Sequence, residues 1–217
     1  MDAPPDLAAA FHKLHFLKLE CNSSSDAGTL KYNLKNHFNA EVTEIIGHLD
    51  ESVNNIELEA FDSSKNCKGS MNKLFSITIS KQADVMEYDM HCEIMSITGQ
   101  VISSITMKDS GLSTYNYNVL DSAGALLLQV SRKQIQQGHT EFQITTLDGC
   151  VNARVDIHNG KVFLSMVPEL DSFSKVTLVC LMMVMDLAEN QQKESSASKR
   201  DSAFDTSKFY TNQKLIA

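Results

Sequence analysis

The apolar positions between residues 74 and 167 recur at every second residue. Phe75, Ile77 and Ile79, for example, alternate with three hydroxyl-bearing residues. Five more such runs begin at Met90, Tyr115, Leu126, Val151 and Val162. Alternation of this kind is typical of strands with one buried face. Turn residues such as Asp148-Gly149 and Asn159-Gly160 separate the runs and predict tight hairpins. The segment is therefore predicted to be an antiparallel meander, sandwich or barrel.

A different pattern precedes the alternating runs. Between residues 6 and 61 the apolar residues are spaced three or four apart, which is typical of an amphipathic helix. The main stripe consists of Phe38, Val42, Ile45, Leu49, Val53 and Ile56. We therefore expect residues 1–70 to form a helical arm at the N-terminus. The stripe either packs on the protein's own core, which is the more common arrangement, or pairs with a partner helix.

Residues 176–185 are apolar in every direction, apart from Thr177. Ten residues of helix span about 15 Å, about half of a bilayer core, so a membrane crossing is not expected. Pro168 should end the last strand, and Asp171 or Ser172 should cap the helix. A helix with no polar face needs cover on all sides. We therefore predict an α+β fold in which an antiparallel barrel at 71–190 surrounds this helix, with a two-layer α+β core as the alternative. Residues 191–217 are expected to form a disordered tail.

Two stretches carry a resemblance to a known superfamily. Residues 119–128 contain Asp121-x-x-Gly124 between apolar residues, and Arg132-Lys133 follows. This stretch resembles a hairpin of LURP-one-related proteins. Val167-Pro168-x-x-Asp171, which leads into the apolar helix, resembles the closing helix of that family. LURP-one-related proteins, phospholipid scramblases and tubby proteins share a twelve-stranded barrel around a hydrophobic helix. Only 34 residues separate Lys133 from Pro168, so either the barrel has fewer strands or part of residues 6–73 completes it.

The resemblance implies lipid contact, because tubby-type barrels bind phosphoinositide headgroups through basic side chains. The candidates here are Arg132, Lys133, Lys108 and Arg154. Residues 71–190 contain eight Lys and Arg against thirteen Asp and Glu. Each basic residue near an anionic surface contributes roughly 1 kcal/mol, so a patch of two or three would bind weakly. Solvated strand-end charges are the preferred interpretation of Arg132 and Lys133.

Charge and cysteine content narrow the class of protein further. The formal charge is −8 and the pI is near 5.3, which argues against nucleic-acid binding. The cysteines are Cys21, Cys67, Cys92, Cys150 and Cys180. Their odd number and wide spacing, and a first segment unlike a signal peptide, predict no structural disulfide. We therefore expect a cytoplasmic or nuclear protein, with peripheral membrane association as the alternative.

The sequence contains no complete catalytic motif and no metal motif. His12 and His15 are too few for a metal site. Adjacent strand residues point to opposite faces, so His91 and Cys92 should not form a nucleophilic pair. We therefore expect no enzymatic activity and no cofactor. The leading hypothesis is a protein-interaction or adaptor protein, which binds a protein partner or self-associates through the N-terminal stripe. The alternative is a phosphoinositide- or membrane-binding tether.

Overall fold

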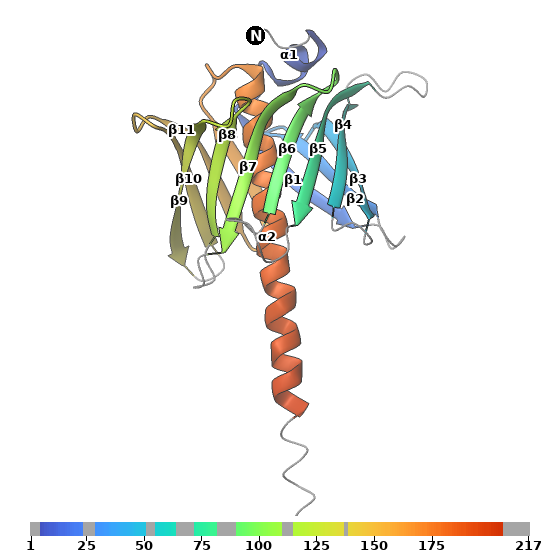
Figure 1. Cartoon of the computed structure of the whole chain (residues 1–217), viewed down its shortest axis with the longest axis vertical. Helices are drawn as coiled ribbons and strands as arrows, with labels where there is room; N and C mark the ends of the chain where they lie inside the picture. The colour runs from blue at the N-terminus through green and yellow to red at the C-terminus, as the bar shows by residue number, and fades with distance from the viewer. Residues whose placement is uncertain are drawn as a thin grey trace, which may run out of the picture. The chain divides into compact units, whose positions relative to one another are not determined.

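The protein is a twelve-stranded antiparallel barrel with one short and one long helix (Figure 1). The structure, a computed structural model, describes residues 5–23, 29–50, 55–63, 72–81, 90–109, 115–136 and 139–205. The elements in chain order are α1 (Pro5–Phe11), β1 (Phe16–Ser23), β2 (Thr29–Asn36), β3 (Glu41–Asp50), β4 (Asn55–Asp62), β5 (Lys73–Lys81), β6 (Met90–Ser96), β7 (Val101–Asp109), β8 (Tyr115–Asp121), β9 (Leu126–Gln136), β10 (His139–Thr146), β11 (Val151–His158), β12 (Lys161–Met166) and α2 (Ser172–Asp205). The prediction of an α+β barrel around a hydrophobic helix is confirmed.

The barrel has a simple up-and-down order. Each strand pairs with its neighbours in sequence, and β1 pairs with β12 to close the ring, in a register that sets Phe16 opposite Ser165. Because successive strands run in opposite directions, the connections after even-numbered strands all lie at one end. The β2–β3, β6–β7, β8–β9 and β10–β11 hairpins therefore share an end with α1 and with the start of α2 (Figure 1).

The first turns of α2 fill the interior of this barrel. Every residue from Val176 to Met183 is at most 1% exposed, so no face of this part of the helix reaches solvent. The Thr177 hydroxyl lies 2.7 Å from the Ser103 hydroxyl of β7. Burial alternates along strand β6, where Cys92 is buried and its two neighbours are half-buried. Apolar residues of the strands and of the helix thus form one core, as the alternation and the apolar run together predicted.

The start of α2 is held by two polar residues. The Asp171 carboxylate accepts hydrogen bonds from the backbone N–H groups of Phe173 and Ser174 at 2.9 and 3.0 Å, so Asp171 is the N-cap. Lys175 is fully buried and donates to the carbonyl oxygens of His12 and Pro168 at 2.7 and 3.0 Å. Burial lowers the pKa of Lys175. This side chain therefore ties α2 to the segment that links α1 to β1.

Helix α1 contributes apolar side chains at the same end. Leu7 and Phe11 are buried, and the Phe11 ring lies edge-on to the Phe75 ring of β5, 6.1 Å between centroids. The expected helical arm over residues 1–70 is helical at Pro5–Phe11. The rest of the expected helical arm is not helical.

The amphipathic helix predicted over residues 38–56 is wrong. Phe38 lies in the β2–β3 turn, Val42, Ile45 and Leu49 lie in β3, and Ile56 lies in β4; Val53 lies outside the described residues. Val42 is half-buried on the outer side of β3, whereas Ile45 is fully buried on the inner side. Strands β1–β4 thus come from the N-terminal part of the chain, and residues 6–73 complete the barrel.

Gly47 lies where β3 and β4 approach each other closely. A Cβ atom at this position would lie 1.9 Å from the Leu58 side chain and 3.1 Å from the Glu57 carbonyl oxygen of β4. Glycine therefore permits the close approach of β3 to β4, where Gly47 is paired with Leu58. In an amphipathic helix the same residue would only weaken the helix.

The chain forms two compact units, residues 1–183 and 184–217. The first contains the barrel and the first turns of α2. In the second, helix continues to Asp205, within the stretch from residue 191 for which the sequence predicts a disordered tail. The remainder of the expected tail, residues 206–217, lies outside the described residues.

The hydroxyl pair inside the barrel gives a first testable prediction. Thr177 donates to the Phe173 carbonyl oxygen at 3.0 Å, so the Ser103 hydroxyl is the donor to Thr177. Thr177→Val should lower the free energy of unfolding by about 1–3 kcal/mol, because Ser103 would be buried without an acceptor. Urea denaturation should show a lower midpoint. The double variant Ser103→Ala/Thr177→Val should lose less than the sum of the single variants; strict additivity would contradict the pairing.

Candidate functional site

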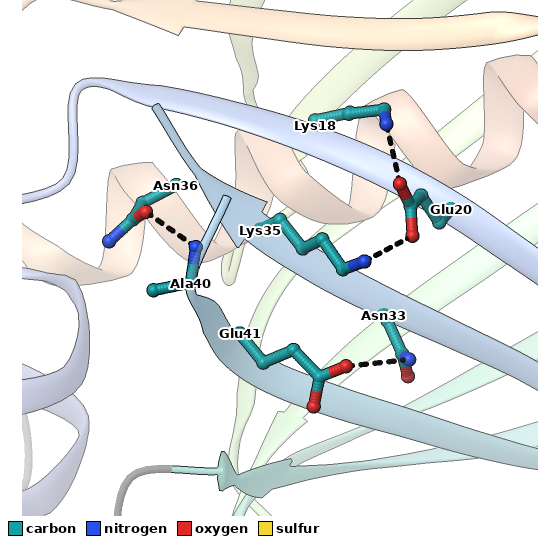
Figure 2. Close-up of polar contacts among 7 residues, drawn as sticks. All are labelled: Lys18, Glu20, Asn33, Lys35, Asn36, Ala40 and Glu41. Carbon is teal, nitrogen blue, oxygen red and sulfur yellow. Dashed lines mark hydrogen bonds and ion pairs between the residues drawn. The ribbon is translucent and has the colours of Figure 1, made fainter. Parts of the chain in front are cut away.

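The outer face of β1–β3 is covered by charges that pair with each other. Glu20 lies between Lys18 and Lys35, with nitrogen–oxygen distances of 2.5 and 2.6 Å (Figure 2). The hydrogen bonds from these two lysines lower the pKa of Glu20. Lys31 pairs with Glu44. A face whose charges are already satisfied offers little to a ligand, so we place the candidate site elsewhere.

Arg132, the first lipid-headgroup candidate, lies on the inner side of β9. It is opposite Phe142 of β10, and its guanidinium carbon is 5.9 Å from the centre of the Phe142 ring. Tyr117 of β8 packs edge-on to the same ring at 5.9 Å. Arg132 is half-buried in this aromatic cluster.

The other three basic candidates are exposed on three different strands. Lys108 is on β7, Lys133 on β9 and Arg154 on β11. One strand separates each from the next, so they are roughly 10 Å apart across the sheet. Lys133 is directly opposite Glu141, which is in turn opposite Asp156. The structure therefore does not bring the four candidates together into one cationic patch.

Four hairpin tips at the α1 end of the barrel have the same backbone design. In each, the N–H of the first residue donates to the carbonyl oxygen of the fifth, and the N–H of the fourth donates to the carbonyl of the first, at 2.8–3.0 Å. The fourth residue has a positive φ of 63–86°, which glycine or asparagine tolerates best. The tips are Asn36–Ala40, Ser96–Gln100, Asp121–Ala125 and Thr146–Cys150.

The first residue of each tip adds a side-chain bond to this frame. Its oxygen accepts a hydrogen bond from the N–H of the fifth residue, as between Asn36 and Ala40 at 3.1 Å (Figure 2). Asp121 accepts from Ala125 at 2.9 Å in the same way, and Ser96 and Thr146 repeat the contact. Each tip is thus fixed in conformation by local bonds.

These tips present apolar side chains to solvent. Phe38 is 77% exposed, Leu147 57% and Ile97 54%. All but one of the large apolar side chains exposed among the described residues lie at this end of the barrel, the exception being Ile135. We define the hairpin rim as the exposed apolar residues Phe38, Ile97, Val101, Leu126, Leu127, Leu147, Val151 and Val167. They lie at one end of the barrel, in or beside the connections between strands.

The charges beside the hairpin rim are mainly negative. Three acidic residues, Asp148, Glu169 and Asp171, lie in the described connections at this end, whereas Lys13 is the one lysine or arginine in them. Hydrogen bonds from the Thr146 hydroxyl and the Cys150 N–H lower the pKa of Asp148. Burial raises the pKa of Asp171, but hydrogen bonds from Ser174 and Phe173 outweigh it and the net pKa is lowered. Both carboxylates are therefore ionised at neutral pH.

The two core cysteines are poorly suited to act as nucleophiles, and the described part of the chain shows no metal ligand set. Cys92 and Cys180 are free thiols in the core, and burial raises the pKa of both, which disfavours the reactive thiolate. His91 and Glu93 lie on the other face of β6 from Cys92. The described residues contain no group of three or more His, Cys, Asp or Glu that could hold a metal ion.

The stripe expected to bind a partner helix is divided between core and surface. Ile45 and Ile56 are buried in the barrel, whereas Phe38 belongs to the hairpin rim. The sequence pattern missed the rim because its members lie up to 129 positions apart and meet only when the barrel closes. A signal was present in the recurring turns, each with an apolar residue beside a turn-forming one, such as Ile97 before Thr98-Gly99.

No protein-family model, curated protein or solved structure matches this chain. The resemblance to the tubby-like families therefore remains a prediction from the motifs. Among the described residues, no helix combines the length and apolarity needed to cross a membrane.

Proposed function

We propose that the protein is a non-enzymatic binding protein on a tubby-like barrel, and that it docks a protein partner through the hairpin rim. The observation that carries this proposal is the exposure of apolar side chains on conformationally fixed tips. Large exposed apolar side chains gathered at one end of a protein are a feature of interaction sites. Because the tip backbone is fixed by hydrogen bonds such as Asn36–Ala40, little conformational entropy would be lost on binding.

The charge around the hairpin rim favours a protein partner over an anionic membrane. Asp148 and Glu169 would repel acidic headgroups, whereas basic side chains around an apolar centre would complement them. The second candidate function, a phosphoinositide tether, has Lys108, Lys133 and Arg154 as exposed cations. They lie on separate strands, so each would contact a headgroup singly, and we rank this function second.

Site-specific photo-crosslinking in cells tests the proposal. A benzoylphenylalanine at position 38 or 147 should give the same discrete protein adducts, because both positions lie on the hairpin rim. The matched control is position 31, where Lys31 pairs with Glu44 on the outer face of β2; it should give none. Equal adducts at all three positions, or none at 38 and 147, would contradict docking through the rim.

A variant and a lipid assay complete this test. Phe38→Ser/Leu147→Ser should abolish the adduct of a crosslinker placed at Ile97 while leaving the melting temperature nearly unchanged, since exposed substitutions usually shift stability by within about 0.5 kcal/mol. Co-sedimentation with vesicles containing phosphoinositide provides the second measurement. Vesicle binding that is lost in Lys108→Glu, without rim-dependent crosslinking, would support the tether instead.

A further inference from the structure

The ladder between β8 and β9 has three residue pairs and is the shortest in the described barrel wall, followed by the four pairs of β1 with β12. The two strands pair through Asn118 with Gln129, Val119 with Leu128 and Leu120 with Leu126. On its other side β8 pairs with β7 along its whole length, and β9 pairs with β10 over most of its length. The β8–β9 register would next bring Tyr117 opposite Val130 and then Asn116 opposite Ser131, but the ladder includes neither pair. The two strands therefore diverge beyond Asn118 and Gln129.

A cavity of about 680 Å³ extends from Leu120 and Leu126, at the paired end of the ladder, to this divergence. Asn116 and Asn118 of β8 line one side, Gln129 and Val130 of β9 the other, and Lys108 of β7 joins them. The volume falls within the usual range for ligand sites. The cavity thus lies beside the positions where the next rungs of the ladder would form.

The position of the cavity between two diverging strands favours an extended peptide as its occupant. A strand edge carries N–H and C=O groups at the spacing of another strand and is a template for strand addition. The side-chain amides of Asn116, Asn118 and Gln129 can both donate and accept, which suits a peptide backbone.

Lys108 favours an occupant that carries a negative charge. On the β1–β5 part of the barrel, Lys18, Lys31, Lys35 and Lys73 each pair with a glutamate. Within the part of the chain that the structure describes, Lys108 has no ion-pair partner, and its ladder neighbour is Asn116. A carboxylate on an incoming segment would supply the missing partner.

We define the β8–β9 seam as the region where the two strands diverge, beside Lys108, Asn116 and Val130. We propose that this seam binds an extended peptide segment as an added strand, with an acidic side chain of that segment placed against Lys108. Leu126 belongs both to the hairpin rim and to the lining of the cavity. The seam recognises a peptide backbone and a carboxylate, whereas the rim presents apolar side chains, so the two proposals are tested by different measurements.

Three nine-residue synthetic peptides test the seam on the full chain. The first alternates Thr and Val with Glu at its centre, the second has Lys in place of Glu, and the third is the first with alternate backbone amides N-methylated. In amide NMR titrations the Glu peptide should shift the resonances of Asn116, Val130 and Ser131 and bind at least about ten-fold more tightly than the Lys peptide. N-methylation should abolish binding, because it removes the main-chain donors.

Two variants complete the design. Lys108→Glu should reverse the preference between the Glu and Lys peptides, whereas Lys133→Glu, on the outer face of β9, should preserve it. Failure of all three peptides to bind, or binding that survives N-methylation, would overturn strand addition. A soluble short-chain phosphoinositide that shifts these resonances when the peptides do not would also overturn it, and would assign the cavity to a phosphate ligand. None of these results depends on the crosslinking from the hairpin rim.

Discussion

Leu181→Asp should leave almost no folded, soluble protein. Leu181 is fully buried in the part of α2 that the barrel encloses, and its neighbours Cys180 and Met182 are equally buried. A carboxylate at this position would have no hydrogen-bond donor positioned to pair with it. An unpaired buried charge costs several kcal/mol of folding free energy. A loss above about 4 kcal/mol is comparable with the whole stability of many domains. The measurements are the soluble fraction after expression and the cooperativity of thermal unfolding.

Leu181→Met is the matched control for this variant. It keeps the residue apolar and nearly conserves its volume, so it should cost less than about 1.5 kcal/mol and leave a cooperative transition. A soluble Leu181→Asp variant with a sharp transition would mean that the helix is not the core of the barrel. Loss of folding in both variants would mean that position 181 tolerates no substitution. The buried charge would then not be the reason why Leu181→Asp fails to fold.

Six of the eight strands from β5 to β12 were predicted, because apolar and polar residues alternate along them; no run was recognised at β7, where residues 103–107 are all buried, or at β10. In β6 the buried and half-buried residues alternate strictly from Met90 to Ser96, which reproduces the apolar alternation of the sequence. The central helix was predictable for the opposite reason. The run from Val176 to Met183 has no polar side, so only an interior position satisfies it.

The four N-terminal strands were not recognised because β3 carries apolar residues on both faces. Val42 and Ile46 are half-buried on the outside, and Ile45 is buried on the inside. Together with Leu49 they reproduce the spacing of a helix, at i, i+3, i+4 and i+7. The β-branched residues Val42, Thr43, Ile45 and Ile46 were the signals that favour a strand.

The candidate sites depend on closure of the barrel, which a local pattern cannot show. Phe38 and Leu147 belong to hairpins 109 positions apart and share a surface only because even-numbered connections fall at one end. The β8–β9 seam depends on where one ladder stops. The turns at the hairpin tips were partly predictable from the sequence, since Gly149 was predicted to be in a tight turn and has a φ of 86°.

The fragment 71–190 should not fold by itself. It begins just before β5, at Lys73, and so lacks β1–β4, which form a third of the closed barrel. Without them β5 and β12 become open edges, and the apolar side of the helix that faces β1–β4 is exposed. Four strands of buried residues, among them Leu17, Tyr32, Ile45 and Leu58, would be lost. Each such side chain contributes about 1.5–3 kcal/mol when fully buried, more in sum than a domain's net stability.

The fragment should therefore be insoluble or show no cooperative thermal transition. Co-expression with residues 1–70 is the control, because the cut falls in the β4–β5 connection and leaves every strand of both pieces intact. The two pieces should then assemble into a soluble complex, held by the β4–β5 ladder of Ile56 with Ile79 and Leu58 with Ile77 and by the closing ladder of β1 with β12. A sharp, reversible transition in the fragment alone would show that residues 1–70 are a separate module rather than part of the barrel wall.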